Sequence, residues 1–167
     1  MNYQKIETCN IGNGTGFRVV LWVSGCNHHC PYCQNQETWN PDSGKPFTAK
    51  QEKQIIKYLS KDYISGLTLS GGDPLHPNNI ETVTQLCKTI KEKLPNKNIW
   101  LYTGSSYEDI ENLEITNYVD TIVDGQFKID LRDITLAFRG SSNQRIIDVK
   151  ASKSQKSVVL NDLSSKR

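Results

Sequence analysis

The stretch Phe17-Arg18-Val19-Val20-Leu21-Trp22-Val23 is a nearly continuous apolar run that begins after one glycine and ends just before Ser24-Gly25. Its β-branched and aromatic residues predict a strand buried on both faces, which is typical of parallel sheets. The segment Cys26-Asn27-His28-His29-Cys30-Pro31-Tyr32-Cys33 follows directly. The sequence therefore predicts a buried strand that leads into a cysteine-rich loop.

Beyond this loop, strand-like and helix-like apolar patterns alternate. Helices are predicted at residues 48–61, 79–93 and 107–113, and further strands at 67–70, 98–103 and 118–123. Thr48 is the expected N-cap of the first helix. Alternation of this kind indicates βαβ units, so we expect a single α/β domain around a parallel sheet. The chain is too short for a complete eight-stranded barrel, which typically needs ~250 residues.

Several chemically distinctive segments follow the predicted strands. They are the cysteine loop, Gly71-Gly72-Asp73-Pro74, Thr103-Gly104 and Asp124-Gly125. Because functional groups of α/β folds collect at the carboxyl ends of parallel strands, we expect these four segments to meet on one rim.

The composition favours a folded protein. The 167 residues include 20 Lys and Arg against 18 Asp and Glu, a net charge of +2, and 3 Trp, 7 Tyr and 4 Phe. The basic residues are dispersed except in the tail, which argues against a nucleic-acid partner, and no apolar run is long enough for a bilayer. Without a signal peptide, we expect a cytoplasmic protein, with one domain at 1–149 and a flexible Lys/Ser-rich tail at 150–167.

Three of the five cysteines, Cys26, Cys30 and Cys33, fall within eight positions and indicate a metal site. Three thiolates leave one iron of a 4Fe-4S cluster without a protein ligand, which is open to a small molecule. A zinc site completed by His28 or His29, a soluble electron carrier and a chance grouping of buried cysteines are the alternatives. Two further thiols are expected outside the site: Cys87 as a core residue and Cys9 as a stray surface or core thiol.

At these residues the chain resembles the radical S-adenosylmethionine superfamily, whose signature is Cys-x3-Cys-x-aromatic-Cys. Further segments are similar to the activating proteins of anaerobic (class III) ribonucleoside-triphosphate reductases. These segments are Asn2-Tyr3, Asn13-Gly14-x-Gly16, Ser24-Gly25-Cys26, Thr38-Trp39, Gly71-Gly72-Asp73-Pro74-Leu75, Asp124-Gly125 and Arg139-Gly140-Ser141-Ser142-Asn143-Gln144. The resemblance spans about residues 1–145.

The resemblance implies an incomplete parallel β/α barrel and a 4Fe-4S cluster held by Cys26, Cys30 and Cys33. S-adenosylmethionine would bind the open iron, and one electron would cleave it to methionine and a 5′-deoxyadenosyl radical. This radical would take a hydrogen atom from a glycine of the reductase. The implied contacts of S-adenosylmethionine are Tyr32, Cys33, Gln34, Gly71, Gly72 and Asp73.

The same resemblance implies partners. These are the large subunit of the anaerobic reductase, an electron donor such as flavodoxin or ferredoxin, and a homodimer or a complex with the reductase. Activation of another glycyl-radical enzyme, of the formate-lyase type, is the nearest alternative, and a non-catalytic zinc-binding module is the alternative from another class. Arg139 and Arg145 are candidate contacts of the cofactor carboxylate or the reductase, or else solvated surface residues.

Overall fold

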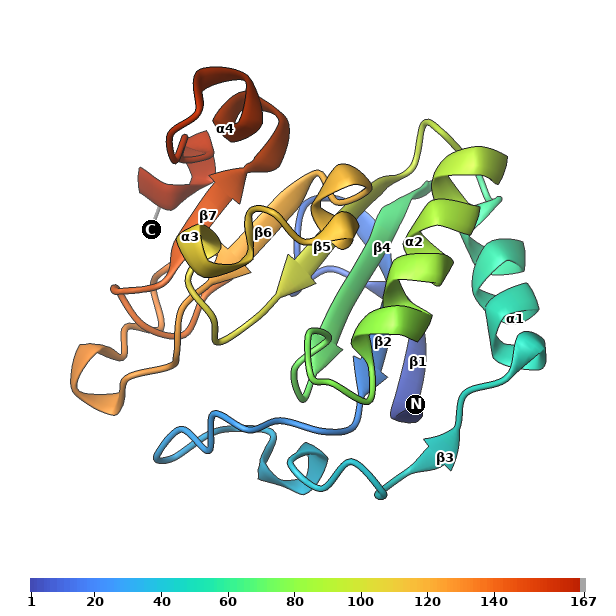
Figure 1. Ribbon diagram of the computed structural model, residues 1–167, viewed down its shortest axis with the longest axis horizontal. Coiled ribbons are helices and arrows are strands. Elements are labelled where there is room, and N and C mark those ends of the chain that lie inside the picture. Colours follow the sequence, from blue (N-terminus) through green and yellow to red (C-terminus); the bar gives the residue numbers. More distant parts are fainter. Residues whose placement is uncertain (166–167) are drawn as a thin grey trace.

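Seven strands form one mixed sheet in the computed structural model, which describes residues 1–165 (Figure 1). The strands are β1 (Asn2–Asn10), β2 (Phe17–Val23), β3 (Lys45–Pro46), β4 (Ile64–Gly71), β5 (Asn98–Tyr102), β6 (Thr121–Asp124) and β7 (Arg145–Asp148). The α-helices are α1 (Ala49–Leu59), α2 (Ile80–Lys93), α3 (Tyr107–Ile110) and α4 (Val149–Gln155). The 3-10 helices are η1 (Gln36–Thr38), η2 (Glu114–Asn117), η3 (Ile129–Leu131) and η4 (Asp162–Ser165).

The four central strands of the sheet are parallel, and they are the four that the sequence predicts. They lie side by side in the order β2, β4, β5, β6. At the edges, β1 and β3 extend the sheet beyond β2, and β7 extends it beyond β6, all by antiparallel pairing. The predicted parallel sheet is therefore confirmed at the centre, and the expectation of a purely parallel sheet is wrong at both edges.

The first strand, β1, is absent from the sequence prediction for a physical reason. Its residues are mostly half-buried, and polar and apolar side chains do not alternate regularly along it. Its pairing with β2 shifts register between Tyr3 and Lys5 and again between Glu7 and Asn10. Such irregularities break the two-residue period on which strand recognition depends.

The predicted helices α1 and α2 are present close to their predicted limits. Thr48 caps α1 as expected: its Oγ1 accepts from the Lys50 amide at 3.3 Å, and Gln51 Oε1 accepts from the Thr48 amide at 3.1 Å. The third predicted helix is shorter and ends at Ile110. Within residues 1–165, no helix has both the length and the apolar character that a membrane crossing requires.

Alternate residues of the central strands face two different environments. On one face, Leu67 and Leu69 of β4 belong to a large apolar core that also includes Ile55 of α1 and Leu86 of α2. These helices lie in front of the sheet in Figure 1. The other face carries polar and aromatic side chains, among them Thr68, and α1 and α2 do not cover it, so this second face is the one available for a site.

A buried cation, Arg18, closes the second face at the end that is farther from the cysteine loop. Arg18 has no exposed surface and donates to Thr68 Oγ1 at 2.6 Å, to Asn98 Oδ1 at 2.7 Å and to the Leu67 carbonyl at 2.6 Å. Its guanidinium also stacks over the Trp100 ring at 5.4 Å. Burial lowers the pKa of Arg18 to about 10, so the guanidinium stays charged at neutral pH.

The segment predicted to be a flexible tail contains helix α4. After this helix, the Val159 carbonyl accepts from the Asp148 amide at 2.9 Å, and Leu160 forms an antiparallel bridge with Ile147 of β7. The segment after α4 is thus attached to the edge of the sheet through this bridge. Residues 166–167 of the predicted tail lie outside the described residues, and the flexibility of the tail in solution stays a prediction.

Candidate functional site

The four segments predicted to share one rim line a single cavity. This cavity has a volume of about 150 Å³ and lies beyond the carboxyl ends of the parallel strands. In Figure 1 the cysteine loop (light blue) and the loop after β6 (orange) lie beyond these same strand ends. Residues from all four segments line the cavity, among them Cys26, Cys30, Cys33, Gly71, Gly72, Asp73, Thr103, Gly104 and Gly125.

The cysteine loop is tightly wound. His29 and Tyr32 both adopt left-handed backbone conformations, with φ of 46° and 58°, which are uncommon for residues with a side chain. The Cys33 amide donates to the Cys30 carbonyl at 3.0 Å and closes a short turn between the second and third cysteines. This winding brings three thiols from eight consecutive positions to one cavity.

The donor set of the cavity suits an iron–sulfur cluster. Cys30 is buried, and Cys26 and Cys33 are half-buried. The backbone N–H group of Asn35 donates to the Cys33 sulfur at 3.4 Å. Such N–H donors stabilise thiolates and the sulfur ligands of clusters. Within residues 1–165 no three His, Cys, Asp or Glu side chains are already grouped around one metal-ion position, so what the thiols share is the cavity that they line.

Two of the three loop thiols, Cys26 and Cys30, have a raised pKa. Burial raises the pKa of Cys26 and of Cys30 above the usual thiol value, and the nearby Asp73 carboxylate also raises both. Metal centres bind thiolates, so loading of this site must release protons.

A second, larger cavity of about 460 Å³ adjoins the first, over the face of the sheet opposite α1 and α2. The two cavities share residues from the cysteine loop, the strand ends and the segments after β6. The shared residues are Cys33, Asn35, Ser70, Tyr102, Phe127 and Gln144. A ligand in the larger cavity would therefore lie next to a group bound by the thiols.

Most of the residues predicted to contact S-adenosylmethionine lie at these two cavities. Cys33 and Gln34 line the larger one, and residues 71–73 line the smaller one together with Cys33. Tyr32 lines neither cavity, and its side chain is 73% exposed.

The two glycines of this set are required by a close approach of the backbone. Gly71 has φ of 106°, and a Cβ there would come within 2.7 Å of the Val23 backbone. A Cβ at Gly72 would lie 2.4 Å from the Gly25 carbonyl oxygen. The double glycine thus lets the end of β4 lie against the start of the cysteine loop.

Several lining residues are absent from the sequence prediction. Ser70 and Tyr102 each directly precede a predicted rim segment. Their place at the end of a predicted strand is the signal from which they could have been identified. Phe127 and Asn35 lie in irregular segments, where sequence gives no periodic pattern. Tyr102 donates from its hydroxyl to the Phe138 carbonyl at 2.8 Å, and burial raises its pKa.

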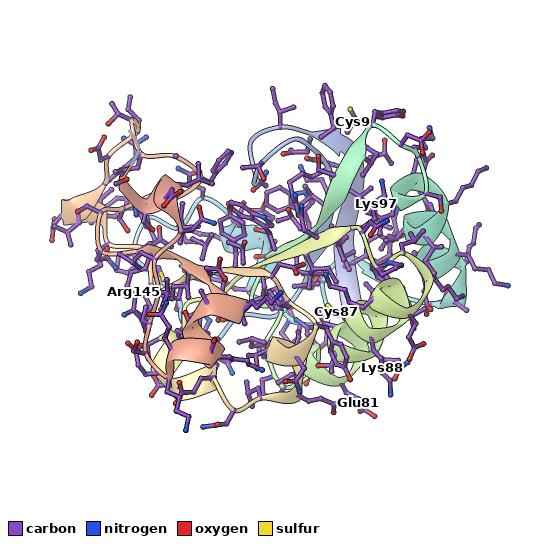
Figure 2. All side chains as sticks on the ribbon, turned by 90° about the horizontal axis from the view of Figure 1, so that it is seen from above. Cys9, Glu81, Cys87, Lys88, Lys97 and Arg145 are labelled. Atoms are coloured by element: carbon purple, nitrogen blue, oxygen red, sulfur yellow. The ribbon has the colours of Figure 1, made fainter. Side chains whose placement is uncertain are left out.

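Three other residues singled out from the sequence lie outside both cavities. Cys87 is fully buried in α2, whereas Cys9 is exposed on β1, and the two are well apart (Figure 2). Within residues 1–165 all five cysteines are free thiols. Arg145 extends from β7 and binds carboxylates of the protein itself (Figure 2). Cys87 is therefore a core thiol, as predicted.

Comparison with known proteins agrees with the chemistry of this site. Residues 12–147 match the family described as 4Fe-4S single cluster domain, and the chain belongs to this family.

Individual relatives define the family more narrowly. The chain is 49% identical to the anaerobic ribonucleoside-triphosphate reductase-activating protein of Enterobacteria phage T4, over 87% of this chain and 93% of that protein. It is 43% identical to the protein of the same name from Escherichia coli K12, over 86% and 96% of the two chains. With the relative from Vibrio cholerae the identity is 42%, over 87% and 97%. The chain thus belongs to the family of anaerobic ribonucleoside-triphosphate reductase-activating proteins.

Proposed function

We propose that this protein is a radical S-adenosylmethionine activase that generates the glycyl radical of an anaerobic ribonucleoside-triphosphate reductase. The observation that carries the proposal is the pair of adjoining cavities, one lined by all three cysteines of the loop and both lined by Cys33. Membership of a 4Fe-4S family whose relatives are named as activating proteins supports the same activity.

In this proposal, Cys26, Cys30 and Cys33 hold a 4Fe-4S cluster with one iron free of protein ligands. When bound, the cluster supplies the electron that cleaves S-adenosylmethionine to methionine and a 5′-deoxyadenosyl radical, which takes hydrogen from a glycine of the reductase. The protein orients the reactants and excludes water, because the difficult chemistry belongs to the cofactor.

The residues around the cavities then have separate tasks. Residues 71–73 line the small cavity, where their backbone oxygens and the negative charge of Asp73 suit the methionyl ammonium. Cys33 and Gln34 flank the nucleoside in the larger cavity. Tyr32, at the outer surface of the loop, packs against the adenine once the ligand is bound.

The remaining parts of the proposal concern the fold and the partners. The four parallel strands, with helices on one face and cavities on the other, support an incomplete barrel of the radical S-adenosylmethionine type. The partners are the reductase large subunit and a small electron donor such as flavodoxin or ferredoxin, and the protein forms either a homodimer or a complex with the reductase. The free thiols suit a reducing, cytoplasmic setting.

Anaerobic reconstitution with metal analysis tests the proposal. We expect about four irons per chain, and a visible absorbance that bleaches on reduction. Cys9→Ala is the matched control, because it removes a thiol remote from the cavities and should keep the iron. One tightly bound zinc per chain with no uptake of iron would contradict the proposal and favour a zinc-binding module.

A further inference from the structure

The start of the cysteine loop is attached to the rest of the protein by backbone hydrogen bonds, whereas its middle is not. At the start, Gly25 donates to the Thr38 carbonyl at 2.7 Å, and its own carbonyl accepts from the Asp73 amide at 2.7 Å. In the middle, the backbone–backbone hydrogen bonds of residues 27–32 stay inside the loop, as far as residues 1–165 show. The middle of the loop therefore depends on side chains for its attachment to the strand ends.

His28 provides such an attachment in two directions. Its Nε2 donates to Asp73 Oδ2 at 2.7 Å, and its Nδ1 accepts from Gln126 Nε2 at 3.3 Å. Asp73 follows β4 and Gln126 follows β6, so one imidazole joins the loop to two different strand ends. The side chains of His28 and Asp73 are 20% and 5% exposed, so the contact is largely shielded from water.

The carboxylate that receives His28 is itself fixed. Asp73 Oδ2 also accepts from Thr103 Oγ1 at 2.9 Å and from the Gly104 amide at 3.2 Å, while Oδ1 accepts from the Leu75 amide at 2.8 Å. These donors come from the segments after β4 and β5. His28 is therefore bound to a rigid acceptor.

The imidazole also packs directly on the backbone of the rim. A Cβ placed on Gly104 would come within 2.4 Å of His28 Cδ2 and 2.6 Å of His28 Cγ. The ring thus occupies the space that any side chain at position 104 would need. Gly104 has an ordinary backbone conformation, so alanine there would displace the His28 ring without straining its own backbone.

We infer that His28 is a positioning residue for the iron–sulfur cluster, which it serves by fixing the middle of the cysteine loop to Asp73 and Gln126. The inference rests on the proposed function, and it assigns no ligand role to the imidazole. Outer partners of this kind hold the ligands in place and adjust the electronic properties of the metal.

The test compares His28→Ala and Gly104→Ala with wild type after anaerobic reconstitution. His29→Asn is the matched control, because it removes the neighbouring imidazole, which packs on Trp39, and asparagine tolerates the left-handed backbone. We expect His28→Ala and Gly104→Ala to lose iron to a chelator about tenfold faster than wild type. Both should also shift the reduction potential of the cluster, whereas His29→Asn should match wild type in both measurements. His28→Gln, which can still donate to Asp73, should restore part of the lost retention.

Hydrogen exchange of the metal-free proteins provides an independent readout. Amides of residues 27–33 should exchange faster in His28→Ala than in wild type, with no change in helices α1 and α2. Unchanged iron loss, potential and exchange in both variants, with iron bound to wild type, would overturn the role of His28 alone. A wild-type chain that takes up no iron would overturn the proposed function and this inference with it.

Discussion

Arg145 of β7 and Asp124 of β6 form an ion pair at the edge of the site, in which Arg145 Nε donates to Asp124 Oδ1 at 3.1 Å. The Asp124 side chain is only 2% exposed. Its Oδ2 also accepts from the Tyr107 amide at the start of α3, at 2.8 Å. The outer side of the guanidinium binds the exposed Glu108 with both NH groups, at 2.9 and 2.7 Å. Arg145 thus ties β6, β7 and α3 together and has a structural role.

Replacement of Arg145 by methionine should be strongly destabilising. The substitution leaves the buried Asp124 carboxylate without its counter-charge, which we expect to lower the free energy of unfolding by about 3 kcal/mol. Urea denaturation of the metal-free protein measures this value. Glu108→Gln is the control, because it removes the exposed partner and should cost no more than about 0.5 kcal/mol. Equal effects of the two substitutions would contradict the structural role of the buried pair.

The Arg145–Glu108 pair should also be visible in the pH dependence of stability. The hydrogen bonds from Arg145 lower the pKa of Glu108 from 4.5 to about 2. A carboxylate with a lowered pKa stabilises the fold above its unfolded pKa, and this contribution disappears as the pH falls from about 4.5 to about 2. Because Glu108 is 55% exposed, solvent screening limits the effect to about 0.5 kcal/mol. Wild type and Glu108→Gln should therefore differ at pH 6 and converge near pH 2; a constant difference would contradict this assignment.

Cys87→Ala should reduce stability and leave the site intact. Cys87 has no exposed surface in the core between α2 and the sheet, and burial raises the pKa of its thiol to about 12. Loss of the sulfur leaves a small cavity, which should cost about 1 kcal/mol in urea denaturation. The exposed Cys9 is the matched position, and Cys9→Ala should change neither stability nor iron content. Loss of iron from Cys87→Ala would show that this core thiol acts on the cluster.

Cys30→Ala should leave the fold intact and abolish activity. Its thiol lines the small cavity and lies in a loop outside the core strands, so the circular dichroism spectrum of the variant should match that of wild type. Cleavage of S-adenosylmethionine, followed as 5′-deoxyadenosine by chromatography, should be abolished because one of three cluster ligands is missing. Normal production of 5′-deoxyadenosine by this variant would exclude Cys30 as an essential ligand.

The central sheet and the meeting of four segments at one rim were predictable because each depends on a local signal. Continuous apolar runs mark β2 and β5, and glycine-rich segments mark the strand ends. The edge strands were not predictable in this way. β1 is irregular and half-buried, and the four residues of β7 are recognisable as a strand only through their pairing with β6.

The candidate site likewise has some parts that a local sequence signal predicts and others that it does not. The three cysteines and residues 71–73 are recognisable because their chemistry is concentrated in short motifs. The attachment of His28 to Asp73 and Gln126 joins positions that are 45 and 98 residues apart, so no local pattern contains it. The enclosure of the larger cavity by Phe127 likewise depends on the path of an irregular loop.

The most direct test of the central claim is electron paramagnetic resonance of the reductase after activation. Reduced, reconstituted protein is mixed with S-adenosylmethionine and the anaerobic reductase under argon, with Cys30→Ala as the inactive control. The account predicts a glycyl radical signal on the reductase that requires both S-adenosylmethionine and the wild-type protein. A fully loaded wild-type protein that produces no glycyl signal, or a signal of equal size with Cys30→Ala, would contradict it.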